Sequence, residues 1–387
     1  MPWKETLAVE LRTRFVMQAL QGEMPFARLC RDYGISTKTG YKWKERFEGE
    51  GAKGLSDRSR RPRTSPQQIS EDQICRIVNL KNAHQRWGPK KIRQLLMRKH
   101  AEVEAASLST VKRVLKKAGL VEERGRRKAH ECGRIENRVK AQEPNQVWST
   151  DFKGHWYSAD RKRVQPLTVQ DAYSRYVLCA QALPDSRTET VKQSFEKMFE
   201  CYGLPQTIRS DNGTPFASTR SPLGLSQLSA WWVSLGINLD RIRPGHPEEN
   251  GGHERMHRDL AIEVEHSSDG SWEEQQAELE LWRTERNEER PHEALGMRAP
   301  AELYKKSERR FDPKEKVELD YPREQLKRRV SSSGEIQIAG VRIRITEAVA
   351  KWDVGLQEIG EAKYAVWFGP LCLGKLNLET EAFEALQ

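Results

Sequence analysis

The stretch from residue 145 to residue 287 constrains the fold of this chain most, because its hydrophobic pattern changes type along its length. Three β-type runs, QVWSTDFKGHWYS, RVQPLTVQDAYS and RYVLCAQAL, are separated by turn residues, which is typical of an antiparallel meander. Helix patterns then alternate with two short strands, TIRS and INLDRIR. The helix patterns cover residues 188–204, about 224–235, 252–265 and 272–287. Strands followed by alternating strands and helices predict an α/β layer with a mixed sheet.

The first of two helical modules is predicted over residues 1–53, where the sequence follows the pattern of a helix-turn-helix. In FARLCRDYGISTKTGYKWKERF, Cys30 is small enough for close helix packing, Gly34 suits a left-handed turn, and Ser36 suits the N-cap of the second helix. That helix carries a basic stripe at i, i+4 and i+8, which fits a DNA groove. The stripe consists of Lys38, Lys42 and Arg46. An ordinary helical hairpin is the alternative.

A second module, of helix-turn-helix or winged type, is predicted over residues 69–122, after a basic linker at 54–68. Its last helix pattern, SLSTVKRVLKKAGL, has one apolar face and stops at Gly119. We predict that polar and basic residues of the linker and the module contact DNA. These residues are Arg58, Arg60, Arg61 and Arg63 in the linker and Lys90, Lys91, Thr110, Lys112, Arg113 and Lys116 in the module.

The distribution of charge separates the N-terminal third of the chain from the rest. Residues 1–140 contain 33 basic and 16 acidic side chains, whereas residues 141–387 contain 33 basic and 40 acidic side chains. This asymmetry is typical of a polyanion-binding module joined to a domain of another kind. A solvated basic face without a ligand would have the same charge, so the motifs must decide between the two interpretations.

The cysteines and the hydrophobic runs indicate the cellular compartment of the protein. The six cysteines are scattered without a C-x-x-C pair, which favours reduced thiols over a disulfide framework or a cysteine-based zinc site. The start, MPWKETLAVELRTR, lacks the apolar core of a signal peptide, and no apolar run reaches 18 residues. We therefore expect a cytoplasmic protein that is neither secreted nor membrane-spanning.

A small all-β barrel is predicted over residues 312–387. The runs KVELDY, EIQIAGVRIRI and YAVWFGPLCLG are short, strand-like and interrupted by glycines, which favours an SH3-like or similar barrel. A charged connector at 123–143 joins the helical modules to the central domain at 144–306. The chain is thus predicted to be multidomain, with N-terminal all-α helix-turn-helix modules, a central α/β core and a C-terminal all-β barrel.

Three acidic residues of the central domain stand where its strands and helices would converge. Asp151 lies in the first strand, Asp211 directly follows a later strand in a D-N-G turn, and Glu254 begins a helix after a glycine-containing loop. Carboxylates are the ligands that hard divalent cations prefer. Two such ions about 3.5–4 Å apart can activate a hydroxyl and stabilise the leaving oxygen of a phosphodiester. For any one acid taken alone, a solvated surface position is the ordinary alternative.

Five ordered segments of the chain resemble the integrase core of insertion-sequence transposases and retroviral integrases, the DDE class. These segments are VWSTDF, QDAYSRYV, RSDNGTPF, HPEENGGHERMH and NEERPHEALGMRAPAELY. Upstream, GLSDRSRRPRTSP, WGPKKI and SLSTVKRVLKKAGLV resemble the bacterial insertion-sequence branch of that class. The resemblance covers roughly residues 20–305.

The resemblance implies an RNase H-like fold for the central domain and a Mg²⁺-dependent polynucleotidyl transferase. Asp151, Asp211 and Glu254 would be both the catalytic residues and the ligands of two Mg²⁺ ions, for which Mn²⁺ can substitute. Further residues would shape the site or contact DNA beside it. The site-shaping residues would be Asn212, Gly213, Asn250 and Gly251, and the DNA contacts Lys153 and Arg255.

The implied function is that of a DNA transposase. It would bind the terminal inverted repeats of its element, free 3′-OH ends and join them to target DNA, as a dimer or tetramer on double-stranded DNA in a bacterial cell. One departure from the family is the separation of Asp211 and Glu254 by 42 residues, longer than in much of the family. We attribute the excess to an insertion, STRSPLGLSQ. The alternative is a non-catalytic helix-turn-helix regulator with an inactive integrase-like core.

The segment His253-Glu254-Arg255-Met256-His257 also matches H-E-x-x-H, the helix motif of zinc peptidases. Relative to Glu254, and at about 100° per residue, the two histidines fall at about 260° and 300°. That face also carries the apolar residues Met256, Leu260 and Val264, so two zinc ligands there would compete with core packing. A possible third zinc ligand exists downstream at a tolerable spacing, in Glu273, Glu274 or Glu278. The zinc peptidase is therefore the weaker interpretation.

Overall fold

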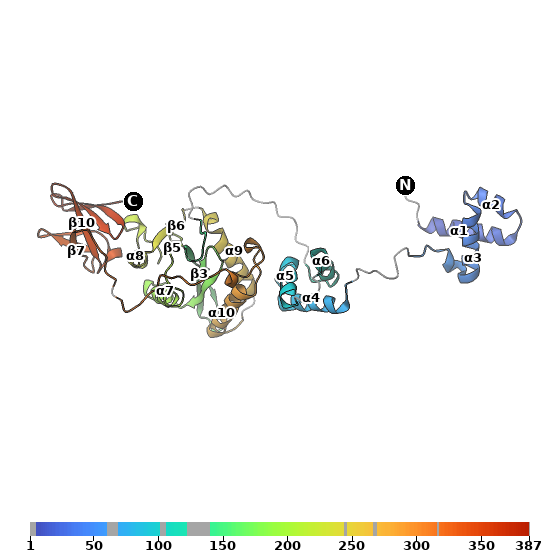
Figure 1. Ribbon diagram of the computed structural model, residues 1–387, viewed down its shortest axis with the longest axis horizontal. Coiled ribbons are helices and arrows are strands. Elements are labelled where there is room, and N and C mark those ends of the chain that lie inside the picture. The colour runs from blue at the N-terminus through green and yellow to red at the C-terminus, as the bar shows by residue number, and fades with distance from the viewer. Residues whose placement is uncertain are drawn as a thin grey trace. The chain divides into compact units, whose positions relative to one another are not determined.

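A computed structural model describes residues 5–59, 69–100, 106–121, 140–243, 246–265, 269–315 and 317–386 of the chain. The chain divides into two compact units, Met1–Ile69 and Ser70–Gln387. Figure 1 shows the elements of both units along the chain. The N-terminal region is helical, the central region holds a mixed sheet, and the C-terminal region is rich in strands, as the sequence predicts.

The first unit is a helix-turn-helix module. Its helices are α1 (Glu5–Gln21), α2 (Phe26–Asp32) and α3 (Thr37–Glu50), followed by the 3-10 helix η1 (Gly51–Leu55). The Oγ of Ser36 accepts the backbone N–H of Thr39 at 3.2 Å, and Gly34 has a φ of +65°, so the turn between α2 and α3 forms as predicted. Leu55, placed by the sequence in the linker, is fully buried against this module instead.

Gly40 allows α3 to pass close to α2 and α1. A Cβ at this position would lie 2.6 Å from Cys30 Sγ and 3.0 Å from the ring tips of Phe15 and Phe26. We expect Gly40→Ala to destabilise the module by about 1–3 kcal/mol through overpacking. In the same helix, a Cβ at Gly49 would meet nothing within 4 Å. Gly49→Ala should therefore stabilise the module by about 0.5–1 kcal/mol, the usual gain in helix propensity.

Hydrogen exchange of the α1–α3 backbone amides in the full chain measures both effects. Protection should fall in Gly40→Ala and hold or rise in Gly49→Ala. Equal protection in the two variants would mean that the close approach at Gly40 does not limit packing.

The second helical module opens the second unit. It consists of α4 (Glu71–Ala83), α5 (Pro89–Lys99) and α6 (Leu108–Lys117). Ser107 caps α6 by accepting the backbone N–H of Thr110 at 3.2 Å. The apolar faces of the three helices meet in a small core of Ile77, Ile92, Leu95, Leu96, Val111, Val114 and Leu115, all buried.

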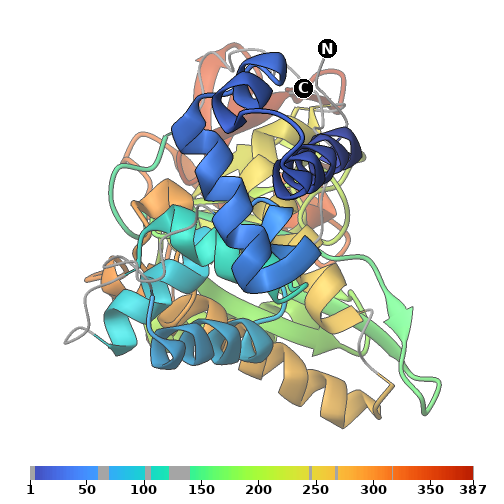
Figure 2. The same cartoon turned by 90° about the vertical axis from the view of Figure 1, so that its right-hand side faces the viewer.

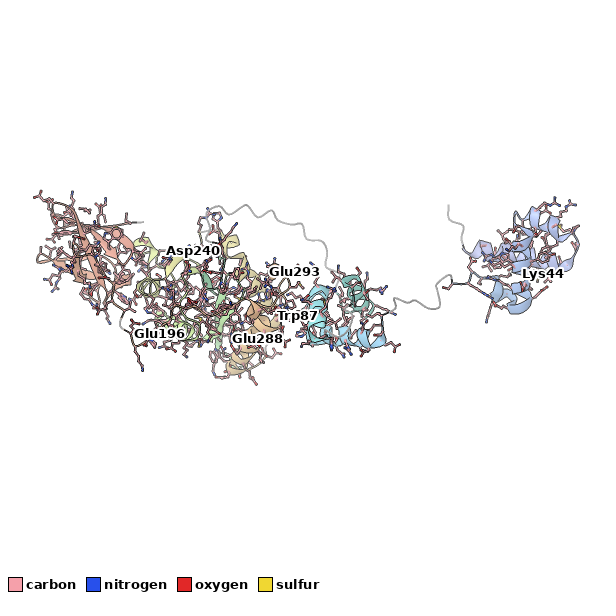
Figure 3. All side chains as sticks on the ribbon, viewed as in Figure 1. Lys44, Trp87, Glu196, Asp240, Glu288 and Glu293 are labelled. Carbon is pink, nitrogen blue, oxygen red and sulfur yellow. The ribbon has the colours of Figure 1, made fainter. Side chains whose placement is uncertain are left out.

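The central domain is built on one mixed sheet. Its strands are β1 (Val147–Phe152), β2 (Trp156–Tyr157), β3 (Arg163–Asp171), β4 (Val177–Leu183), β5 (Thr207–Ser210) and β6 (Asn238–Arg241). β3 pairs antiparallel with β1, β2 and β4, and β5 pairs parallel with β1 and β6. Opposite each other on β5 and β6, Arg209 and Asp240 form an ion pair at 2.6 Å (Figure 3 labels Asp240).

Helices cover both faces of this sheet. One hydrophobic cluster joins the sheet to α7 (Thr188–Tyr202) and α8 (Gln227–Ser234), and includes the predicted core residues Trp231 and Trp232. A second cluster joins β3 and β4 to α9 (Gly251–Leu260) and α10 (Trp272–Glu288). α10 lies against β4 (Figures 1 and 2). After α9 the chain continues in a π-helical turn, Ala261–Glu265. Short 3-10 helices occur at Pro222–Gly224, Pro247–Asn250, Glu293–Leu295, Pro300–Glu302 and Glu347–Val349.

The C-terminal region forms two antiparallel sheets around a common core. Five strands follow the order β13-β12-β11-β10-β7, and β8 pairs with β9. The strands are β7 (Leu326–Arg329), β8 (Glu335–Ile338), β9 (Val341–Arg344), β10 (Asp353–Gly360), β11 (Lys363–Phe368), β12 (Leu371–Asn377) and β13 (Ala382–Ala385). Their buried face includes Ile336, Ile343, Val354 and Phe368.

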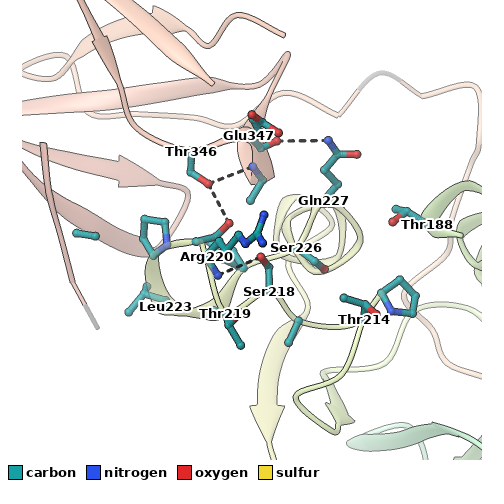
Figure 4. A pocket seen from close by; sticks show the side chains of 18 of the residues that line it. Thr188, Thr214, Ser218, Thr219, Arg220, Leu223, Ser226, Gln227, Thr346 and Glu347 are labelled. Atoms are coloured by element: carbon teal, nitrogen blue, oxygen red, sulfur yellow. Dashed lines mark hydrogen bonds between the residues drawn. The ribbon is translucent and has the colours of Figure 1, made fainter. Parts of the chain in front are cut away.

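The predicted insertion before α8 connects the central domain to the C-terminal sheets. Leu225 is fully buried in the C-terminal core, and the backbone N–H of Leu223 donates to the carbonyl of Leu386 at 3.2 Å. Figure 4 shows the groove of about 1150 Å³ beside this connection, where Gln227 of α8 donates to the carbonyl of Glu347. The residues of the predicted insertion thus build an interdomain contact.

Candidate active site

Asp151 and Asp211 come from neighbouring parallel strands. Asp151 is the fifth residue of β1, and Asp211 directly follows β5. Because β1 and β5 pair in parallel, both side chains stand toward the same end of the sheet. Glu254 lies in the first turn of α9 and is exposed. The three acids predicted from the sequence are therefore delivered by β1, β5 and α9.

The electrostatics of Asp151 reflect this convergence. Burial, followed by the nearby carboxylates of Asp211 and Glu254, raises the pKa of Asp151 from 3.8 to about 7, against the lowering effects of the Phe152 backbone N–H and Lys153. A half-buried carboxylate with two like charges beside it is costly without a counter-cation. This is the electrostatic environment expected of a cation site.

In metal-free protein, this environment predicts that Asp151→Asn increases stability. The folded-state pKa of Asp151 lies above its ordinary value, so the charged form is disfavoured in the fold and its cost grows as the pH rises through this window. We expect the excess stability of Asp151→Asn, measured by thermal unfolding in EDTA, to grow by about 1–3 kcal/mol between pH 5 and pH 8. A stability difference that does not change with pH would contradict this account.

The D-N-G turn holds Asp211 in place. The backbone N–H of Gly213 donates to Asp211 Oδ1 at 3.1 Å, and a Cβ at Gly213 would lie 2.9 Å from Asp211 Oδ2. The side-chain amide of Asn212 donates to the carbonyl of Ile242 at 2.6 Å, which ties the turn to the end of β6. Gly213 thus leaves space beside the carboxylate of Asp211, and its backbone N–H orients that carboxylate.

The loop before α9 differs in one detail from the prediction. Asn250 is buried at the start of the helix, as a site-shaping residue would be. A Cβ at Gly251, however, would meet nothing within 4 Å, whereas one at Gly252 would collide with the guanidinium of Arg175. Of the two glycines, Gly252 is therefore the one that packs against another side chain, and the sequence did not indicate it because Arg175 lies far away along the chain.

The two histidines of the H-E-x-x-H segment point into the domain. His253 is 1% exposed; its Nδ1 lies 2.9 Å from Ser149 Oγ and its Nε2 lies 2.7 Å from Thr168 Oγ1. His257 Nε2 lies 2.7 Å from the same Thr168 Oγ1. In the described part of the chain, Asp151, His253 and His257 form a group with metal-ligating atoms within 4.8 Å of one another.

The ligand set of a zinc peptidase does not assemble around these histidines. The third member of the group is Asp151, not one of the downstream glutamates. Glu273 pairs with Lys162 at 3.1 Å, and Glu274 accepts the backbone N–H of Ser271 in a capping box. Thr168 and Ser149, which contact the histidines, were missed by the sequence analysis. Only the strand register, which places Thr168 opposite Asp151, brings them to the site.

Most of the predicted DNA contacts lie on exposed surfaces. Lys42 and Arg46 lie over the ring of Trp43, and Arg58 pairs with Glu50. Lys153 pairs with Glu265 at 3.2 Å. The exposed residues are Lys38, Lys42, Arg58, Lys90, Lys112, Arg113, Lys116 and Arg255, while Thr110 is half-buried at the N-terminus of α6. Arg60, Arg61 and Arg63 lie outside the described residues.

Lys90 has a partner in the central domain, and Lys91 is half-buried near charged residues of that domain. Lys90 pairs with Glu293 at 3.2 Å. Burial and nearby Arg290 lower the pKa of Lys91 to about 8. Both lysines are therefore directed at the central domain here, which the sequence prediction of DNA contacts did not foresee.

Models of known protein families match most of the chain in four segments. A helix-turn-helix domain matches residues 11–63 and a homeodomain-like domain matches 39–115. Two integrase core domain models match residues 141–247 and 235–300. The chain contains an integrase core domain. This core spans the elements that carry Asp151, Asp211 and Glu254.

The integrase core is homologous to proteins of bacterial insertion elements. The chain is 28% identical over 244 residues to an uncharacterized 31.7 kDa protein of insertion element IS407 from Burkholderia multivorans, which spans 62% of this chain and 82% of that protein. It is 26% identical over 256 residues to an uncharacterized 39.2 kDa protein of IS476 from Xanthomonas euvesicatoria, spanning 65% and 69%. Among solved structures, the catalytic core of BIV integrase matches at 22% identity and a TM-score of 0.31, covering 41% of this chain and 93% of that chain.

None of the helices in the described ranges combines the length and the apolar character that crossing a membrane would require.

Proposed function

We propose that this chain is a DNA transposase that cleaves the ends of its element and joins the freed 3′-OH to target DNA. The observation that carries the proposal is the convergence of Asp151, Asp211 and Glu254, where burial and then the two neighbouring acids raise the pKa of Asp151 to about 7. The integrase core and the helix-turn-helix domains support the same function.

The donor set fits divalent cations. Three carboxylates at one end of a sheet offer the oxygen ligands that Mg²⁺ prefers, and their mutual repulsion is relieved by a cation. We propose Asp151, Asp211 and Glu254 as the ligands of two Mg²⁺ ions, with Mn²⁺ as a substitute. When bound, such ions would activate the attacking oxygen and stabilise the leaving oxygen of the phosphodiester.

The protein's own residues keep these carboxylates in position. The Gly213 N–H bonded to Asp211 Oδ1 orients that carboxylate. The loop leading to Glu254 is held by Glu249, which accepts the backbone N–H of Arg243 at 2.9 Å and pairs with its guanidinium. The folded protein already holds the three acids close together, so their side chains need not be rearranged when DNA binds.

DNA binding is proposed for the N-terminal third. Its excess of basic residues and the exposed face of α3, with Lys38 and Lys42, suit the phosphates and groove of double-stranded DNA. The predicted contacts from Arg58, Lys112, Arg113 and Lys116 belong to this proposal, and Arg255 is proposed to contact DNA beside the acids of the core. We also propose that two or four copies act together, because two DNA ends must be processed, and that they do so on bacterial DNA in the cytoplasm.

An end-cleavage and strand-transfer assay tests the function. The full chain is incubated with double-stranded DNA that carries the ends of its element, in Mg²⁺, in Mn²⁺ or in EDTA. Cleaved and joined products are expected in either metal and not in EDTA. Specific binding to the ends without product in any metal would support the regulator with an inactive core instead.

A further inference from the structure

The hydroxyl of Thr168 determines which nitrogen of His257 carries a proton. Thr168 Oγ1 donates to the backbone carbonyl of Asp151 at 2.9 Å and lies 2.7 Å from Nε2 of both His253 and His257. A carbonyl only accepts, and a hydroxyl has a single proton; with that proton on the Asp151 carbonyl, the hydroxyl oxygen accepts from the Nε2 atoms. His257 therefore has its proton on Nε2 and a lone pair on Nδ1.

That lone pair faces a carboxylate. His257 Nδ1 lies 3.8 Å from Asp151 Oδ2, too far for a hydrogen bond. Two acceptors facing each other at this distance are satisfied by a cation between them. Metal bonds of about 2.1 Å to each atom are long enough to span the gap.

His253 has a different role from His257. Its Nδ1 and Nε2 are both engaged, by Ser149 and Thr168, and the side chain is almost fully buried. Of the group formed by Asp151, His253 and His257 in the described part of the chain, two members therefore retain an atom for an ion. His253 is a positioning residue, which fixes the Thr168 hydroxyl that in turn orients His257.

We propose that His257 Nδ1, together with Asp151, is a ligand of one of the divalent ions in the active site, and that this site binds a first-row transition ion more tightly than Mg²⁺. The inference deepens the proposed function and rests on it only for the assignment of Asp151 to metal binding. An imidazole nitrogen suits first-row transition ions, whereas Mg²⁺ prefers oxygen ligands. His257 lies one turn after Glu254 on α9, so one helix would deliver both a carboxylate and an imidazole.

Pulsed electron paramagnetic resonance of the full chain loaded with Mn²⁺ tests this proposal without DNA or activity. A directly coordinated imidazole gives a ¹⁴N coupling to the manganese electron spin. The coupling is expected in the wild type, and it should be lost in His257→Gln, with a fall in Mn²⁺ affinity of about tenfold or more. His155→Gln is the matched control, because His155 is exposed in the same domain and should leave the spectrum unchanged.

The wild-type spectrum decides the proposal even if a variant does not fold. Absence of ¹⁴N coupling in the wild type, absence of Mn²⁺ binding, or persistence of the coupling in folded His257→Gln would each overturn it. Affinities for Mn²⁺ and Mg²⁺ measured by titration calorimetry should also converge in His257→Gln. Strand transfer without ¹⁴N coupling would support the transposase proposal and contradict the proposal that His257 is a metal ligand. A ¹⁴N coupling without any DNA product would support His257 as a ligand and contradict the transposase proposal.

Discussion

Asp211→Asn is expected to lower end cleavage and strand transfer by about a hundredfold to a thousandfold, while binding to the element's ends is retained. An asparagine keeps the size of the side chain and an oxygen that can accept the Gly213 N–H, so the D-N-G turn is preserved. The substitution removes the negative charge proposed to hold a cation at the reacting phosphodiester. Loss of one preorganised electrostatic group at a reacting centre typically costs this much in rate.

The measurement is product formation in Mg²⁺, together with binding to the same DNA by fluorescence anisotropy. Asp269→Asn is the matched control, since Asp269 is an exposed aspartate of the same domain. Asp151→Asn and Glu254→Gln should behave as Asp211→Asn does. Wild-type rates in Asp211→Asn would remove this residue from the chemistry, and a parallel loss of DNA binding would point to a structural role.

The second large effect is expected at Glu263, in the π-helical turn after α9. Both oxygens of Glu263 accept from the guanidinium of Arg290, at 2.6 and 2.7 Å, and Oε2 also accepts the indole N–H of Trp282 at 2.8 Å. The side chain of Arg290 is 3% exposed. Breaking a buried pair leaves a desolvated charge without its counter-charge, so Glu263→Gln should destabilise the second unit by about 3–5 kcal/mol.

Urea unfolding followed by circular dichroism measures this loss. Glu347→Gln applies the same chemical change to an exposed pair with Arg344, and it should cost no more than about 1 kcal/mol. Similar costs for the two variants would show that the buried pair at Arg290 is not a major source of stability.

The Glu263 pair also bears on the active site. Arg286 of α10 donates to Asp259 on α9 at 2.9 Å, and Arg290 lies 3.8 Å from the same carboxylate. These contacts fasten the C-terminal half of α9 and the turn after it to α10. Glu254 and His257 lie on the same helix, so its attachment at one end sets the position of the proposed ligands at the other.

The sequence predicted those features that depend on neighbours a few residues apart. The cap at Ser36, the left-handed turn at Gly34 and the burial of Trp231 and Trp232 all follow from local patterns. Strand alternation and helical periodicity likewise indicated the mixed sheet and its covering helices. Ordered motifs then indicated the integrase core, because the spacing of acids, glycines and asparagines along the chain carries that information.

The tertiary structure alone decided which distant residues meet. The H-E-x-x-H segment does not distinguish its two histidines. In the structure, Thr168, opposite Asp151 on β3, contacts Nε2 of both of them. Nδ1 of His257 faces Asp151, whereas Nδ1 of His253 contacts Ser149. Gly252 packs against the guanidinium of Arg175. Such contacts depend on strand register and on the packing of helices across the sheet, to which residues far apart in the chain contribute. Local sequence therefore determined the elements and the acids of this protein, and packing determined the surroundings that set their chemistry.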